Sequence, residues 1–438
     1  MAGESDSVER LMVGGVRWLI PVALTVAAWA AERPPNVVLI ISDDHGWTDY
    51  GFMGNDQVLT PRIDQLAKEG LTFTRGYVPT SLCRPSLASM MTGLYPHQHR
   101  VWANDPKGDA RNAEGRERIV SIYRQSKTLA GLLADRGYVS FESGKWWEGG
   151  YRNGGFSEGM THGEVARGGR HGDEGLKIGR ESMKPVLDFI DRAVEKPFFL
   201  WYAPMMPHTP HNPPERLLSK YKDKHPLDVA KYYAMIEWFD ETVGELLNHL
   251  DKRGLRENTL VAYLADNGWV QKPTLFEGRA KMSPYEAGVR TPVILRRPGK
   301  IAARREEQSL ASSVDLAPTI LAALGMKPPS AMTGINLLKQ KRDTAFGAIF
   351  THTAVDEAAP ISGLKCRWMV RGRWKLVAPQ MKNAALLLWP QRPETMWATE
   401  VELYDVVADP QERDNVAARN PKVVEELRRE LERWWRVD

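Results

Sequence analysis

Cysteine is nearly absent from this chain of 438 residues, which contains only Cys83 and Cys366. Two thiols exclude a scaffold held together by several disulfides, and they are too few for a zinc site with four thiolate ligands. An excess of charge of one sign is also missing, because 59 basic and 55 acidic side chains leave a formal net charge of +4. The basic residues are interleaved with acidic ones, so we expect no nucleic-acid partner.

A hydrophobic run long enough to span a membrane is missing as well. The most apolar stretch, residues 11–30, is interrupted by Arg17, after which only 13 residues (18–30) remain free of charge, whereas a bilayer requires about 20. It ends in Ala28-Trp29-Ala30, a pattern typical of a signal-peptide cleavage site. We therefore predict a signal peptide over residues 1–30 and an exported protein, periplasmic or extracellular, with no stable membrane span in the mature chain. An uncleaved anchor and an ordinary N-terminal helix are the alternatives, since the residues before the run are acidic.

Apolar runs alternate with helical periodicity over most of the chain. The apolar runs predict strands at residues 36–41, 72–78, 138–141, 198–202 and 259–264. The helical pattern, often with proline or glycine at its ends, predicts helices at residues 61–70, 127–136 and 229–253. This alternation predicts an α/β fold with a large, mostly parallel sheet flanked by helices. The glycine-rich residues 149–175 lack periodicity and predict a loop insertion.

The pattern changes at about residue 344. Short alternating runs predict antiparallel strands at residues 348–350, 368–370 and 374–377. Residues 423–435 place their apolar side chains on one face and predict a terminal amphipathic helix. We therefore predict a large α/β domain over residues 34–343 and a smaller C-terminal α+β domain over residues 344–438.

Polar side chains stand at the ends of three predicted strands. These side chains are Asp43 and Asp44 after the first strand, His208 after the fourth, and Asp266 and Asn267 after the fifth. Because parallel strands share one carboxyl edge, we expect these side chains to meet. Three carboxylates and an amide oxygen are hard donors, which suit Ca²⁺ or Mg²⁺. Each pair alone is more simply a helix cap or a turn, but their joint placement favours a metal site.

Cys83 is placed at the start of a predicted helix. Pro85 suits the first helical position, so the thiol lies at the helix N-terminus, where partial positive charge stabilises an anion. This position suits a nucleophile that faces an anionic substrate. A lone cysteine is also commonly a small buried apolar side chain, which is the alternative interpretation.

Eight motifs follow one another between Pro35 and Ala417. They comprise residues 36–44, 60–66, 83–93 with 95–99, 144–146, 207–208, 266–268, Lys281 with 285–290, and 403–405 with 409–410 and Asn415. In this order they resemble the sulfatase family, the formylglycine-dependent branch of the alkaline phosphatase superfamily. The resemblance implies a sulfatase-like fold and an arylsulfatase-like hydrolase acting on sulfate esters.

The resemblance also implies a role for each matching residue. A formylglycine-generating maturation enzyme would oxidise Cys83 to an aldehyde, whose hydrate carries the attacking hydroxyl. The implied ligands of a calcium ion, or of Mg²⁺, are Asp43, Asp44, Asp266, Asn267 and the modified residue 83. Lys145 and Lys281 would bind sulfate oxygens, and His208 would act near the bridging oxygen.

Two positions depart from the family pattern. Leu87 stands where the family has an arginine that guides maturation and steadies the hydrated aldehyde. Arg84 lies one helical turn earlier, and residues three apart share a helix face, so we predict that Arg84 supplies this guanidinium. Trp147 stands where the family has a histidine, and an indole N–H transfers no proton near neutral pH. Three histidines are available as substitutes: His162, His171 and His211.

Tryptophans flank the predicted site, and their flat faces suit sugar rings. We predict that Trp147 and Trp269 contact the substrate, which would be a sulfated carbohydrate or an aryl sulfate. Two alternatives remain because of the departures at residues 87 and 147. One is a phosphate or phosphonate monoester hydrolase on the same scaffold, and the other is a non-catalytic protein that binds a glycan or calcium.

Overall fold

The computed structural model describes residues 33–110, 112–271, 279–380, 398 and 400–437. The predicted signal peptide over residues 1–30 lies outside these residues. Within the described ranges, no helix is both long enough and apolar enough to cross a bilayer.

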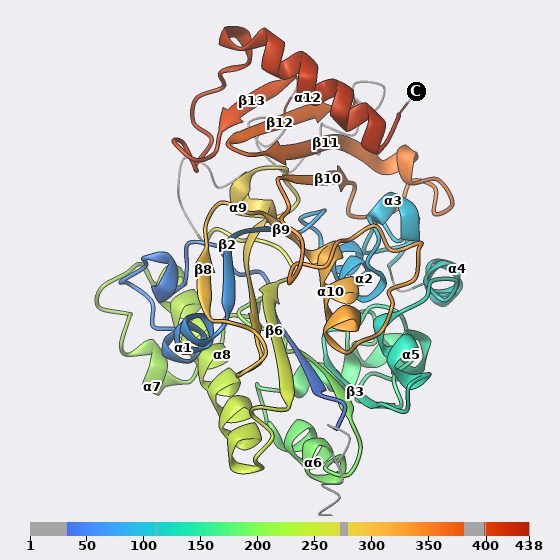
Figure 1. Cartoon of the computed structure of the whole chain (residues 1–438), viewed down its shortest axis with the longest axis vertical. Coiled ribbons are helices and arrows are strands. Elements are labelled where there is room, and N and C mark those ends of the chain that lie inside the picture. The colour runs from blue at the N-terminus through green and yellow to red at the C-terminus, as the bar shows by residue number, and fades with distance from the viewer. Residues whose placement is uncertain (1–32, 111, 272–278, 381–397, 399, 438) are drawn as a thin grey trace, which may run out of the picture. The chain divides into compact units, whose positions relative to one another are not determined.

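A mixed sheet forms the centre of the large α/β region (Figure 1). Its strands lie in the order β4-β3-β5-β1-β6-β7-β2-β8, with β9 paired to β2. Their bounds are β1 Asn36–Ser42, β2 Leu71–Tyr77, β3 Val139–Gly144, β4 Glu158–Gly159, β5 Phe198–Ala203, β6 Thr259–Ala265, β7 Arg290–Arg296, β8 Arg304–Glu306 and β9 Ala311–Ser312. Strand β7 is antiparallel to both β6 and β2, and the other neighbouring strands of this sheet pair in parallel. The prediction of a mostly parallel sheet is confirmed, with β7 as the exception.

The register of the central strands determines which residues emerge together. Strand β1 pairs with β6 from Asn36 opposite Thr259 to Ser42 opposite Ala265. Both strands are buried along their whole length, as their continuous apolar sequences predict. Because the two strands end opposite each other, the residues after Ser42 and after Ala265 leave the sheet at the same place.

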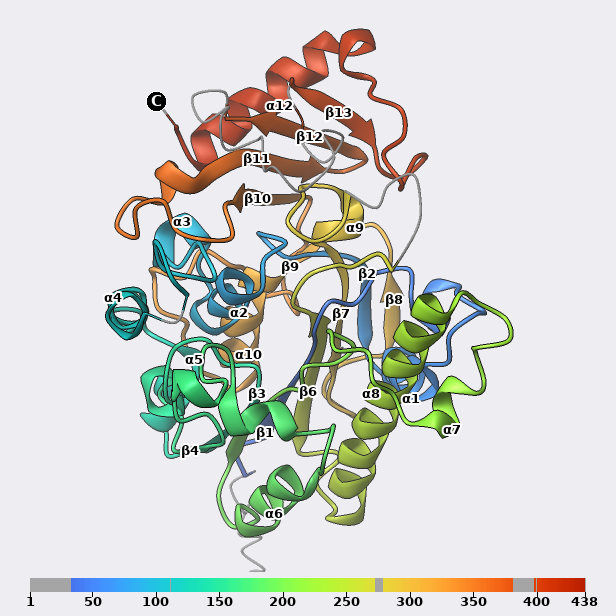
Figure 2. The ribbon, with the colours of Figure 1, turned by 180° about the vertical axis from the view of Figure 1, so that it is seen from behind.

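Helices cover both faces of this sheet (Figures 1 and 2). Alternate residues of β1 serve the two faces: Val37 and Leu39 pack on the side of α2, α5 and α10, and Val38 and Ile40 on the side of α1, α6 and α8. The bounds are α1 Pro61–Glu69, α2 Cys83–Thr92, α3 Pro96–His99, α4 Ala113–Tyr123, α5 Leu129–Ala134, α6 Lys184–Arg192, α7 Glu215–Leu218, α8 Leu227–Lys252, α9 Glu286–Val289 and α10 Leu316–Ala323. The sheet core is thus apolar on both sides, and its carboxyl edge is left for polar side chains.

A second sheet is antiparallel and carries the C-terminal helix. Its strands are β10 Thr344–Phe350, β11 Leu364–Arg371, β12 Trp374–Pro379 and β13 Glu402–Asp405, in that order. Leu427 and Leu431 of α12 (Pro421–Trp434) pack against Leu376 and Leu403 of the sheet. The predicted antiparallel strands and terminal helix are confirmed, whereas the division into two domains at residue 344 stays a prediction.

Two local predictions need correction. Helix α2 begins at Cys83, so Pro85 occupies its third position rather than its first. A proline is still accommodated there, because the first turn of a helix has no intrahelical use for its N–H groups. The glycine-rich insertion is more regular than predicted, since it contains the short strand β4 and the 3-10 turns η2 (Tyr151–Gly154), η3 (Val165–Arg167) and η4 (Asp173–Lys177).

Candidate active site

An acidic cluster forms where β1 and β6 end. Asn267 Nδ2 donates a hydrogen bond of 2.7 Å to Asp44 Oδ1, and the Asp44 backbone N–H donates one of 3.2 Å to Asp266 Oδ1. Ligand atoms of Asp43, Asp44 and Cys83 lie within 4.8 Å of one another. The thiol of Cys83 lies 3.5 Å from Asn267 Oδ1. The structure therefore brings together all five residues that the resemblance implies as metal ligands, and all five are buried.

Two lysines are embedded among these acids. Lys145, one residue beyond β3, places Nζ 2.6 Å from the Asp43 carboxylate and 3.7 Å from Asp266 Oδ2. Lys281 Nζ lies 2.6 Å from Asp44 Oδ1. Burial alone would lower the pKa of each lysine, but the neighbouring carboxylates raise the pKa of both above its usual value. Both side chains are therefore cationic at neutral pH.

Asp266 is the least satisfied member of the cluster. Its Oδ2 atom is buried and, among the described residues, has no hydrogen-bond partner. Burial and the nearby carboxylate of Asp43 raise the pKa of Asp266 well above its usual range. A divalent cation would compensate this buried charge, and carboxylate and amide oxygens are the donors that Ca²⁺ and Mg²⁺ prefer. The residues present therefore fit such an ion.

Cys83 lies beside the cluster at the first position of α2. Burial raises the pKa of its thiol to about 11, although Lys145 and Lys281 act in the opposite direction. A thiol with this pKa is protonated at neutral pH, and the thiolate is the nucleophilic form. Unmodified Cys83 is therefore a weak nucleophile in this environment.

His208 approaches the cluster from the turn after β5. Its Nε2 lies 3.4 Å from Asp44 Oδ2, and its Nδ1 donates a hydrogen bond of 2.7 Å to the carbonyl oxygen of Thr209. Burial lowers its pKa. The guanidinium of Arg180 donates to the carbonyl oxygens of Met205 and His208, and so holds the turn in place. Sequence analysis missed Arg180, because nothing near residue 180 indicates a partner 25 to 30 residues away.

Arg84 does not have the surroundings that we predicted for it. Its guanidinium donates two hydrogen bonds, of 2.8 and 2.7 Å, to Glu148, and two more to the carbonyl oxygens of Ala103 and Ile119. Arg84 and Glu148 are both buried. The charges of Arg84 and Glu148 balance each other, and their hydrogen bonds join α2 and α4 to the chain just after Trp147. The structure therefore does not support Arg84 as the replacement for the family arginine. Leu87 is a buried core residue.

Trp147 is not available to a substrate. Its side chain is 3% exposed, and its ring lies 4.8 Å from the guanidinium of Arg170 and 5.8 Å from that of Arg116. The predicted substrate contact of Trp147 is therefore not supported, because cationic groups of other segments cover the indole. Trp147 acts as packing beneath the insertion.

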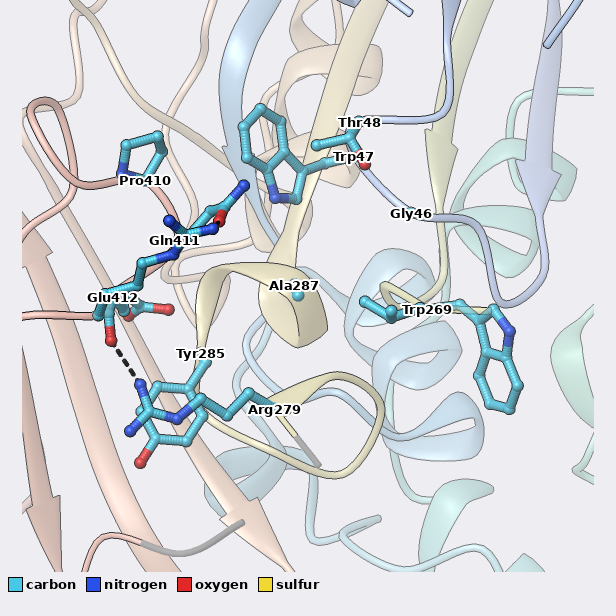
Figure 3. Close-up of a pocket in the computed structure, with 12 residues that line it drawn as sticks. Gly46, Trp47, Thr48, Trp269, Arg279, Tyr285, Ala287, Pro410, Gln411 and Glu412 are labelled. Atoms are coloured by element: carbon cyan, nitrogen blue, oxygen red, sulfur yellow. Dashed lines mark hydrogen bonds between the residues drawn. The ribbon is translucent and has the colours of Figure 1, made fainter. Parts of the chain in front are cut away.

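A pocket of about 380 Å³ lies beside the segments that continue from Asp44 and from Asn267. Trp47 and Trp269 line it together with Tyr285, Arg279 and residues 410–413 (Figure 3). The guanidinium of Arg279 lies 4.2 Å from the ring centre of Tyr285 and also donates a hydrogen bond to the carbonyl oxygen of Glu412. The predicted contact of Trp269 with the substrate remains a prediction. Its indole points away from Trp47 and Tyr285 (Figure 3) and packs against Val58, Tyr232 and Ile236.

A buried glutamate anchors the glycine-rich insertion to β3. Glu142 accepts hydrogen bonds from the backbone N–H groups of Met160 and Thr161 and from the hydroxyl of Thr161. Burial raises the pKa of Glu142 from 4.5 to about 8. Between these two pH values the folded protein keeps a proton on Glu142 that the unfolded chain releases. The free energy of unfolding is therefore unaffected by this group below about pH 4.5 and falls as the pH rises from there to about 8.

We therefore expect Glu142→Gln to change the pH dependence of stability. Between pH 4.5 and 8 the wild type should lose about 1.4 kcal/mol per pH unit relative to the variant. The measurement is the free energy of unfolding in urea at several pH values from 5 to 8. Glu158→Gln is the matched control, because this exposed glutamate belongs to β4 in the same insertion. Parallel pH profiles for wild type and Glu142→Gln would contradict the expectation.

Comparison with known proteins gives two family models and several relatives. The model described as Sulfatase matches residues 35–326, and the model of the N-sulphoglucosamine sulphohydrolase C-terminal region matches residues 275–379. N-acetylgalactosamine-6-sulfatase of Canis lupus familiaris is 31% identical over 368 residues, which cover 73% of this chain and 69% of that protein. N-acetylgalactosamine-6-O-sulfatase of Bacteroides thetaiotaomicron is 25% identical and is aligned over 92% of this chain and 93% of its own length.

Solved structures give the same picture of the fold. The crystal structure of Ps i-CgsB matches with a TM-score of 0.74 at 25% identity, over 93% of this chain and 94% of that one. A phosphonate monoester hydrolase of Agrobacterium radiobacter matches with a TM-score of 0.64 at 21% identity, over 91% and 94% of the two chains, which shows a shared fold only. The predicted sulfatase-like α/β fold is confirmed.

Proposed function

The chain belongs to the sulfatase family and is a sulfuric ester hydrolase, and from this premise we propose that it removes sulfate from carbohydrates with a formylglycine derived from Cys83 and a bound calcium ion. The observation that carries the proposal is the meeting of Asp43, Asp44, Asp266 and Asn267 with Cys83 at adjacent strand ends. The buried Lys145 and the partly buried Lys281 flank this group.

The charge of the cluster supports the binding of a cation before a substrate. The raised pKa of Asp266 favours its neutral form while no cation is bound. Ionisation of all three carboxylates would leave one negative charge in excess of the two lysines, and this charge would repel a sulfate ester. A divalent ion reverses this sign and makes the site attractive to an anion. Calcium is proposed over Mg²⁺ because clusters of carboxylate and amide oxygens without imposed octahedral geometry suit the larger ion.

The state of residue 83 follows from its environment. Because the Cys83 thiol is protonated at neutral pH, a sulfur nucleophile is disfavoured in the unmodified chain. When present, a hydrated formylglycine supplies an oxygen nucleophile and the calcium ion lowers the pKa of that hydroxyl. The maturation enzyme would have to accept a substrate segment with Leu87 in place of arginine.

The other residues would bind and orient the ester. Lys145 and Lys281 would neutralise the nonbridging sulfate oxygens, since their ammonium groups are fixed by Asp43 and Asp44. His208 would act at the bridging oxygen. Its Nδ1–H is held by Thr209 and burial lowers its pKa, so in the neutral ring Nε2 is the unprotonated nitrogen, which would accept a proton at the site before returning it.

The proposed substrate class is a sulfated carbohydrate. The named relatives act on N-acetylgalactosamine 6-sulfate groups, as their names state, and Ps i-CgsB has been crystallised with k-i-k-neocarrahexaose. Trp47 and Tyr285 line a neighbouring pocket, with the guanidinium groups of Arg290 and Arg279 over their rings at 3.9 and 4.2 Å, and this mixture of aromatic and cationic groups would suit a sulfated sugar. The export predicted from residues 1–30 would bring the protein to such polymers outside the cytoplasm.

The test compares the anions released by protein purified from its own host. We expect sulfate release from 4-nitrophenyl sulfate and from 6-sulfated N-acetylgalactosamine to exceed phosphate release from 4-nitrophenyl phosphate. Faster release of phosphate or of a phosphonate would favour the alternative function, a phosphate or phosphonate monoester hydrolase. Binding of sulfated sugar without release of either anion would favour a non-catalytic protein.

A further inference from the structure

We infer that His171 of the glycine-rich insertion contacts the bound sulfate ester and supplies the imidazole that is missing at position 147. This inference deepens the proposed function and rests on it. It concerns a residue far from the position where the family pattern expects a histidine.

The backbone of the insertion is docked onto the strand that carries Lys145. The Trp146 N–H donates a hydrogen bond of 3.1 Å to the carbonyl oxygen of His171. A Cβ atom at Gly172 or Gly175 would come within 2.8 or 2.5 Å of the carbonyl oxygen of Gly144. Only glycine allows so close an approach at these two positions. The sequence of the insertion therefore fixes His171 beside the end of β3.

The position of the imidazole is set by Trp147 and its neighbours. The centres of the two rings are 5.3 Å apart. Arg170, next in the chain, lies over the same indole and binds the carboxylate of Asp105 through hydrogen bonds of 2.7 and 2.5 Å. Arg170 is held by Asp105, and the imidazole packs against the buried indole. The imidazole is therefore fixed in position before a ligand binds.

The imidazole nitrogens of His171 are available to such a ligand. Neither makes a hydrogen bond within the described ranges of the chain, and Nδ1 is buried. Buried polar atoms normally have a partner, and a bound ester could supply one. Lys145, Asp43 and His208 act on this ring electrostatically. Trp146, whose N–H binds the His171 carbonyl oxygen, directly follows Lys145, so His171 lies beside the segment that brings Lys145 to the proposed sulfate site.

The electrostatic surroundings indicate a neutral hydrogen-bonding role. Burial, with Lys145 and Arg170 nearby, lowers the pKa of His171 to about 3. A neutral imidazole offers one N–H donor and one acceptor nitrogen. It can therefore bind an ester oxygen without altering the net charge of the site.

The other two histidines have different surroundings. His162 is exposed, and its ring packs against Tyr151. His211 packs against Tyr232, with 5.5 Å between ring centres. His162 lies in the same insertion, so it provides a matched control.

The test uses His171→Ala, His171→Gln and His162→Ala in the full chain. We expect His171→Ala to lower kcat/KM for a sulfate ester by about 10²-fold, because one oriented hydrogen bond to the reacting group is lost. His171→Gln keeps an N–H donor and should recover about tenfold of this loss. His162→Ala should retain wild-type kcat/KM, and all three variants should keep the wild-type melting temperature.

Activity of His171→Ala within threefold of wild type would overturn the inference, as would equal losses in the alanine and glutamine variants. The dissociation constant of inorganic sulfate, measured by calorimetry, gives a readout that needs no turnover. It should rise about tenfold in His171→Ala and stay unchanged in His162→Ala. An unchanged constant in His171→Ala would also overturn the inference. Absence of sulfate release by the wild type would instead overturn the proposed function.

Discussion

Replacement of Cys83 by alanine is expected to lower kcat/KM for an aryl sulfate by about 10⁴–10⁶-fold, the range associated with loss of a covalent nucleophile. The reason is positional. Cys83 starts α2 and lies 3.5 Å from Asn267, so an oxygen formed at residue 83 would lie against the proposed metal ligands. Initial rates of sulfate release over a range of substrate concentrations give the value.

The second cysteine supplies the control for this experiment. Cys366 is buried in β11 of the C-terminal sheet, where it is part of the apolar core. Cys366→Ala should keep kcat/KM within about twofold of wild type, while it lowers the unfolding free energy by about 1–2 kcal/mol. A Cys83→Ala variant that retained a tenth of wild-type activity would show that residue 83 is not the nucleophile.

The second large effect is expected from Asp266→Asn. This change removes a buried carboxylate whose Oδ2 accepts no hydrogen bond from the residues that the structure describes, and it therefore removes a ligand that the cation would ionise and balance. We expect calcium affinity to fall by at least about 10²-fold and sulfate release to fall with it. Wild type at calcium 100 times its dissociation constant should gain about 2.7 kcal/mol of stability. Asp266→Asn should gain almost none at the same concentration.

Thermal unfolding with and without calcium measures this difference. Asp240→Asn is the matched control, since Asp240 is also buried and has a pKa raised by burial to about 7, but it accepts hydrogen bonds from Arg62 and Ile63 at the start of α1. Asp240→Asn should be less stable than wild type both with and without calcium. Its gain in stability on addition of calcium should equal that of wild type. A full calcium response in Asp266→Asn would contradict the assignment of this aspartate as a ligand.

The central strands and the acidic edge of the sheet could be predicted because their signals are local. A continuous apolar run as short and as rich in β-branched residues as 36–41 favours a buried strand, and polar residues after it mark the strand end. Parallel pairing then places Asp43 and Asp266 together without further information. Strand β7 escaped prediction because it contains Pro292, and proline is unfavourable inside a sheet.

The surroundings of the site could not be predicted, because they depend on contacts between distant residues. We placed Arg84 by its spacing along one helix, but its guanidinium is bound by Glu148, 64 residues later. Trp147 is buried because Arg170 and His171 fold back over it, and the glycine-rich pattern of the insertion gave no indication of this packing. Helix spacing tells which residues share a face, whereas tertiary partners decide where a long side chain ends.

The most direct test of the central claim is the mass of the peptide that contains residue 83, taken from protein made in its native host. The account predicts the mass that results when the CH₂SH group of cysteine is replaced by an aldehyde, in a preparation that releases sulfate. An unmodified thiol at this residue in an equally active preparation would contradict it.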